Sequence, residues 1–155
     1  MGYYVTMDIG GVIIPADKVE DCLNAVNAMF SPIHRDKMSG GSFQGGKQTG
    51  WHYSWVNAPG EGGFATLKDA LEEWRYSATV HENGDVEIDY FNGEKWGDDP
   101  QLYDVLAPFV VENDPNPVIF CRGEDGHHWK HVFKNGICEE VDGKVVYEDD
   151  PDWDD

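Results

Sequence analysis

The spacing of apolar residues predicts a strand, a break and then a helix at the N-terminal end of the chain. Aromatic and β-branched residues dominate positions 3–9, which is typical of a strand. Gly10 and Gly11 interrupt this run before a short apolar segment at 12–14. Apolar residues then recur every three or four positions, which predicts a helix over 15–30.

The rest of the pattern predicts two more helices and several strands. A short amphipathic helix is expected over 66–74, and Pro100 favours the start of another helix just after Asp98 and Asp99. Strands over 78–80 and 86–90 flank Asn83-Gly84, the typical sequence of a type I′ hairpin turn. Further strands, joined by short turns such as Asn135-Gly136, are expected at 117–122, 128–134, 137–141 and 144–147.

Residues 31–63 interrupt this pattern. The segment holds eight of the chain's 18 glycines, so we predict a glycine-rich loop or insertion. Trp51, Tyr53 and Trp55 alternate within it, which indicates a short strand. A glycine-hinged loop carrying aromatic side chains is a candidate for binding a partner.

Together the elements predict an α+β fold with an antiparallel sheet and helices on one side. With the insertion set aside, the first elements follow the ferredoxin-like order, and further hairpins come at the C-terminal end. Residues 1–147 are expected to form a single domain, and residues 148–155 an acidic tail.

Charge narrows the class of partner. The formal net charge is −19, of which residues 1–81 carry −3 and residues 82–155 carry −16. This charge argues against direct binding of nucleic acid or of an anionic membrane, and it predicts a basic protein surface as the partner. The chain has no apolar run long enough to span a membrane, and its three cysteines form no C-x-x-C motif, so we expect a cytoplasmic protein.

Sequence signatures of catalysis or cofactor binding are weak. Residues 41–47 match G-x-x-x-x-G-K, but Gln48 stands where Ser or Thr would hold Mg²⁺. His127 and His131 lie ~13 Å apart on a strand at ~3.3 Å per residue, too far for two Zn–N bonds of ~2.1 Å. We therefore expect a non-enzymatic protein with no metal and no cofactor. The alternative is a small nucleotide- or metal-binding domain centred on Lys47 and on residues 127–131.

An acidic hairpin is the strongest candidate for a binding site. Asp85, Glu87 and Asp89 alternate with apolar residues, which places their carboxylates ~6.6–6.8 Å apart on one strand face. Successive phosphates of one DNA strand are separated by a similar distance, of order 6–7 Å. The other interpretation is a solvated face whose charge prevents edge pairing. Nearby candidates for the same surface are Glu82, Glu94, Asp98 and Asp99, with Trp96 as an anchor.

Three short stretches carry a family resemblance. The opening Met1-Gly2-Tyr3-Tyr4, the turn 123–126 with Trp129, and Phe133 before Asn135-Gly136 resemble small acidic proteins of phages and prophages. Some of these inhibit host defence, as anti-CRISPR proteins do, and some imitate nucleic acid. The resemblance implies an inhibitor that occupies the nucleic-acid groove of a defence nuclease. A non-mimic protein-interaction module that uses the 31–63 loop is the alternative.

Overall fold

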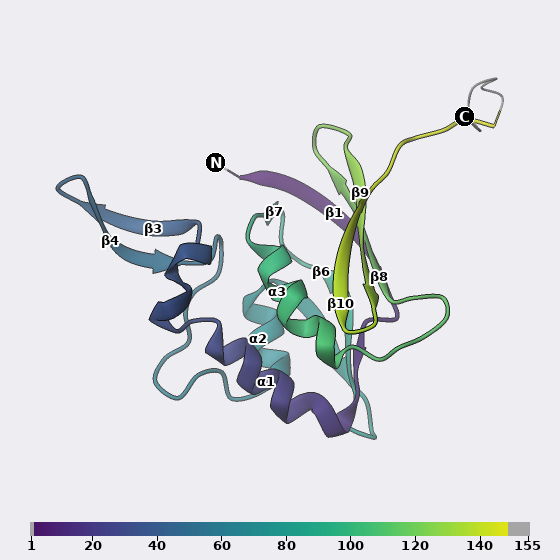
Figure 1. Cartoon of the computed structure of the whole chain (residues 1–155), viewed down its shortest axis with the longest axis horizontal. Helices are drawn as coiled ribbons and strands as arrows, with labels where there is room; N and C mark the ends of the chain where they lie inside the picture. Colours follow the sequence, from purple (N-terminus) through teal and green to yellow (C-terminus); the bar gives the residue numbers. More distant parts are fainter. Residues whose placement is uncertain (1, 149–155) are drawn as a thin grey trace.

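The largest sheet of the fold has five antiparallel strands (Figure 1), in the order β10-β9-β8-β1-β7. The structure is a computed structural model and describes residues 2–148, so the expected acidic tail lies outside the described residues except for Glu148. The strands of this sheet are β1 (Tyr3–Gly10), β7 (Lys95–Trp96), β8 (Val118–Gly123), β9 (His128–Lys134) and β10 (Ile137–Asp142).

A second, three-stranded sheet follows the break predicted at Gly10-Gly11. It has the order β2-β6-β5 and consists of β2 (Ile13–Ile14), β5 (Tyr76–Val80) and β6 (Val86–Phe91). Gly11 has a φ of +72°, a conformation that side chains rarely adopt, and this bend carries the chain from one sheet to the other. The predicted break is therefore confirmed, and its effect is to curl the strands around one core.

Three α-helices fill the space inside this curl. They are α1 (Val19–Ala28), α2 (Leu67–Glu73) and α3 (Asp99–Leu106), and Thr66 caps α2 by accepting a hydrogen bond from the Asp69 backbone N–H. Helix α3 places Tyr103 against His131 and Phe133 of β9, on the inner face of the five-stranded sheet. The α+β prediction is confirmed. The ferredoxin-like order is not, because its β-α-β units need parallel strands and every strand pair in the described residues is antiparallel.

The glycine-rich insertion is more ordered than the sequence indicates. Pro32–Lys37 form a 3₁₀ helix, and β3 (Gly40–Gln44) pairs with β4 (Lys47–His52) in a hairpin that projects away from the five-stranded sheet (Figure 1). The short strand indicated by the alternation of Trp51, Tyr53 and Trp55 is confirmed only in part, because β4 contains Trp51 but ends at His52. Residues 41–47, which resemble a phosphate-binding loop, comprise most of β3, the hairpin turn and the first residue of β4. They therefore do not form a loop between a strand and a helix, as phosphate binding of this type requires.

Two other local predictions are also corrected. Only Gly84 of the Asn83-Gly84 pair has a positive φ, and the Asp85 carbonyl accepts from the His81 backbone N–H at 2.8 Å, which closes a three-residue loop rather than a type I′ turn. Residues 144–147 form no strand, because the Gly143 N–H donates to the His128 carbonyl and continues the β10 pairing instead of turning back. The short turn expected at Asn135-Gly136 is confirmed, and the positive φ of both residues is typical of a type I′ turn. In the described residues no helix has the length and apolar character needed to cross a membrane.

Candidate functional site

Asp85, Glu87 and Asp89, at the start of β6 and along it, form an acidic ridge. Val86 and Ile88, which alternate with them, are 2% and 3% exposed, so the three carboxylates lie on the opposite face of the strand, as predicted. All three residues are partly exposed, and the side chain of Glu87 retains 33% of its accessible surface. Glu82 and Glu94, which precede and follow the ridge in the sequence, are exposed.

Each ridge carboxylate also contacts a neighbour within the protein. Asp85 accepts hydrogen bonds from the Ala16 backbone N–H at 2.8 Å and from the Asn83 amide at 3.0 Å. The Glu87 carboxylate lies 2.9 Å from Nε2 of His81, and Asp89 accepts from the Thr79 hydroxyl. These partners orient the carboxylates without removing them from water.

Asp98 and Asp99 are buried and do not belong to this surface. Asp98 is 8% exposed, and its carboxylate accepts from the backbone N–H groups of Ser39 and Ser54 at 2.9 and 2.8 Å. It also accepts from the Ser39 hydroxyl at 2.6 Å. The side chain therefore ties both ends of the 39–54 hairpin segment to the start of α3. The expectation that Asp98 faces a partner is wrong.

Asp99 is the centre of a buried polar cluster. It is fully buried, and its carboxylate receives two hydrogen bonds from the Arg75 guanidinium at 2.8 and 3.1 Å and one from the Tyr76 hydroxyl at 2.7 Å. Burial raises the pKa of Asp99, and the positive charge of Arg75 opposes that rise. The expectation that Asp99 lies on the acidic surface is wrong.

The Trp96 side chain is partly buried and packs toward the interior. Its ring meets that of Trp129 edge to face at 5.4 Å, and its indole N–H donates to the Tyr103 hydroxyl at 3.4 Å. Its indole therefore links β7, β9 and α3, and this internal packing weakens the case for Trp96 as an exposed anchor.

The three aromatic residues predicted to line the 31–63 loop lie in different environments. The Arg35 guanidinium stacks 4.2 Å from the Trp51 ring centre, while Tyr53 is 1% exposed and donates its hydroxyl hydrogen to the Met29 carbonyl. Trp55 is 42% exposed, with the Lys95 ammonium 4.7 Å from its ring. The structure does not bring them together into one binding surface.

The histidines of β9 lie on a strand, as expected. His131 is 2% exposed and accepts a hydrogen bond from the Trp129 indole N–H at 3.0 Å, and burial lowers its pKa to about 4. His128 points to the opposite face of the sheet. Across residues 2–148, no group of three or more His, Cys, Asp or Glu side chains is placed to hold a metal ion.

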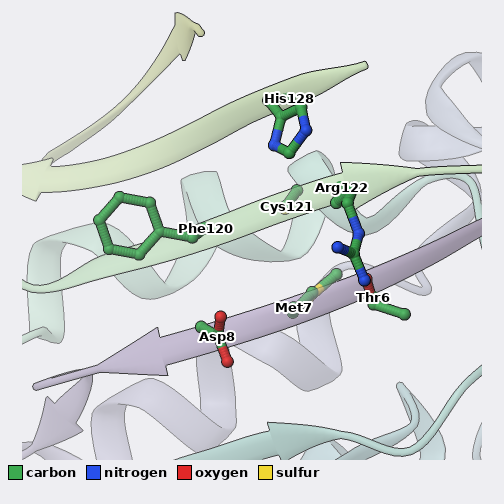
Figure 2. Close-up of a pocket in the computed structure, with 7 residues that line it drawn as sticks. All are labelled: Thr6, Met7, Asp8, Phe120, Cys121, Arg122 and His128. Atoms are coloured by element: carbon green, nitrogen blue, oxygen red, sulfur yellow. The ribbon is translucent and has the colours of Figure 1, made fainter. Parts of the chain in front are cut away.

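The outer face of the five-stranded sheet carries a hollow that the sequence analysis missed. It has a volume of about 260 Å³ and collects side chains of mixed chemistry from β1, β8 and β9. Figure 2 shows Arg122 extending from β8 toward Thr6 of β1, with Phe120 farther along the same strand. Within the described residues the Arg122 guanidinium has no ion pair. The period-two alternation of Phe120 and Arg122 with buried Ile119 and Cys121 is the sequence signal that could have revealed this face.

No family model, curated protein or solved structure matches this chain.

Proposed function

We propose that this protein is a non-enzymatic binding protein that attaches to a basic surface of another protein. The partner class that we propose is a bacterial nuclease of a defence system, whose nucleic-acid-binding groove the acidic protein would occupy. The observation that carries the proposal is the exposure of its acidic side chains: in the described residues, only Asp98 and Asp99 among the acids are buried.

The distribution of charge supports an electrostatic mode of binding. Residues 82–155 carry most of the net charge of −19. Such a field accelerates association with a basic groove and makes binding depend on salt. It also opposes a nucleic-acid ligand, whose phosphates need an excess of Lys and Arg.

The geometry of the acidic ridge supports the imitation of a phosphate row. Side chains two residues apart on a strand are ~6.6–6.8 Å apart, close to the 6–7 Å order of the spacing between phosphates. The contacts of Asp85 with Ala16 and of Glu87 with His81 restrict these side chains, which reduces the entropy lost on binding.

The test is an inhibition assay on a panel of purified defence nucleases that cleave DNA or RNA. For any nuclease that is inhibited, affinity is compared for the wild type and for the triple variant Asp85→Asn, Glu87→Gln, Asp89→Asn. At low salt we expect the triple variant to bind about tenfold more weakly, with a flatter salt dependence, because exposed ion pairs contribute ~0.2–1 kcal/mol each. DNA or RNA should compete with the wild-type protein.

A matched control removes three negative charges elsewhere. Asp21→Asn, Asp36→Asn and Glu61→Gln change exposed acids whose carboxylates accept no hydrogen bond within residues 2–148. This control should retain most of the wild-type affinity. If the ridge variant inhibits as well as the wild type at both low and high salt, the ridge is only a solvated face. Measured turnover of a nucleotide, peptide or ester by the protein would contradict the non-enzymatic class.

A further inference from the structure

Strand β10 is an edge strand of the five-stranded sheet. It pairs with β9 alone in the described residues, and all of its residues except Cys138 are exposed. The backbone N–H of Gly143 donates to the carbonyl of His128 on β9. Because the direction of backbone groups alternates along an antiparallel strand, Glu140 and Asp142 direct their N–H and C=O groups away from β9. These groups are available to another strand.

The chain beyond β10 extends this edge with exposed apolar side chains. Val145, Val146 and Tyr147 are 59%, 39% and 68% exposed and belong to no strand. β-branched and aromatic residues of this kind favour strands, which is why the sequence predicts one here. A strand-forming segment therefore lies next to an open sheet edge without a strand partner of its own among residues 2–148.

The adjoining sheet surface is also apolar and hollowed. Val141 and Phe120 are 37% and 50% exposed, and both line a hollow of about 330 Å³ that reaches Gly143. Every second side chain of a strand added at β10 would point to this face of the sheet and cover part of the hollow.

Charge identifies the kind of strand that fits. Glu139, Glu140 and Asp142 are exposed along the edge, and like charges opposite each other destabilise a strand pair. A second copy of this acidic chain is therefore disfavoured at the edge. A strand carrying Lys or Arg opposite these carboxylates is favoured.

We propose that the edge of β10 and residues 144–147 bind an extended basic segment of the partner protein by β-strand addition. Main-chain hydrogen bonds to Glu140 and Asp142 hold the segment, its basic side chains pair with the edge carboxylates, and apolar side chains pack near Val141. The inference rests on the proposed function for the basic character of the partner. The inference places a second contact with the partner on β10, separate from the acidic ridge, and defines its geometry as strand pairing.

The probe is an acetylated and amidated heptapeptide of alternating lysine and valine. Its affinity is measured by fluorescence anisotropy, together with that of the same peptide N-methylated at alternate backbone nitrogens. The methylated peptide keeps the charge but cannot donate along one edge, so we expect it to bind at least about tenfold more weakly. Bound unmethylated peptide should slow hydrogen exchange at the Glu140 and Asp142 amides.

Two variants of one residue separate the backbone from the charge. Glu140→Pro removes both the outward N–H and the carboxylate, whereas Glu140→Gln removes only the charge. We expect Glu140→Pro to lose at least about tenfold in affinity and Glu140→Gln about two- to threefold. Circular dichroism checks that both variants fold, and the methylated peptide keeps the test independent of any variant.

Equal affinity of the methylated and unmethylated peptides, or protection that spares the β10 amides, would overturn strand addition. If the peptide fails to bind while a nuclease is inhibited in a ridge-dependent way, strand addition is wrong and the proposed function stands. If the peptide binds at the edge while no nuclease is inhibited, strand addition stands and the proposed partner class is wrong.

Discussion

Two groups of aspartate and glutamate close together in the sequence have opposite roles in this protein. Asp85, Glu87 and Asp89 form the acidic ridge on β6 and keep contact with water, whereas Asp98 and Asp99 at the start of α3 are 8% and 0% exposed. Their residue types are the same. What differs is the set of hydrogen-bond donors that the fold brings to each group.

The difference lies in the number and origin of those donors. Asp98 accepts from three donors supplied by residues 39 and 54, and Asp99 from Arg75, Tyr76 and the backbone of Gly97. A buried carboxylate needs such partners, because the cost of removing it from water is several kcal/mol. The ridge carboxylates have fewer partners and remain hydrated. Acidic residues that lie close together in a sequence therefore stay hydrated where the fold supplies too few donors to bury them.

The largest expected effect is on stability when Asp99 is changed. Asp99→Asn leaves the Arg75 guanidinium, whose side chain is 16% exposed, without its counter-ion, and we expect the free energy of unfolding to fall by about 3–5 kcal/mol. Urea denaturation measures this, with Asp85→Asn on the ridge as the matched control. Replacing both partners by apolar residues, Arg75→Met with Asp99→Leu, should recover part of the loss. A loss below about 1 kcal/mol for Asp99→Asn would remove the distinction between the two groups.

A smaller and more local effect is expected for Asp98. Asp98→Ala leaves the N–H groups of Ser39 and Ser54 without their acceptor, which should destabilise the protein by about 2–3 kcal/mol. Because those two residues bracket the β3–β4 hairpin, proteolysis within residues 39–54 should accelerate. Asp98→Asn keeps one acceptor oxygen and should have a smaller effect. Unchanged proteolysis of Asp98→Ala would show that other contacts hold the hairpin.

The interior beside Asp99 should also depend on pH through His131. Burial lowers the pKa of His131 to about 4, so between pH 6.5 and 4 the unfolded chain binds the proton and the folded protein does not. This contribution to stability is present above pH 6.5 and is lost as the pH falls. We expect a loss of about 1.5 kcal/mol between pH 6.5 and 5, measured by urea denaturation. His131→Gln should abolish this loss of stability at low pH. If the variant keeps the pH dependence of the wild type, other groups cause the loss.

The smallest stability effect is expected on the ridge itself. The triple variant Asp85→Asn, Glu87→Gln, Asp89→Asn should change the free energy of unfolding by less than about 1 kcal/mol, since partly exposed charges contribute little. Its effect should appear in partner binding instead. Thermal denaturation of the triple variant beside Asp99→Asn gives the comparison directly. A loss as large as that of Asp99→Asn would mean that the ridge is structural.

Much of the fold could be predicted from local pattern. The strand at the N-terminus, the break at Gly10-Gly11, the three helices and the hairpin at Asn135-Gly136 follow from periodicity and turn chemistry, which act over a few residues. The insertion 31–63 was predicted poorly, because glycine-rich strands carry little alternation. The strand expected at 144–147 has the right residue types but lacks a partner within residues 2–148, and pairing is a property that no local pattern contains.

The sequence alone determined the charge of this protein, the α+β class and the alternation that presents Asp85, Glu87 and Asp89 on one face. Only the tertiary structure decided which acids are exposed to solvent. Asp98 and Asp99 meet donors from residues 39, 54 and 75, which are distant in the sequence. The same long-range packing buried Tyr53 and turned Trp96 inward, and it gathered Phe120, Arg122 and Thr6 on one sheet face. Burial depends on contacts between distant segments, and these exist only once the chain has folded.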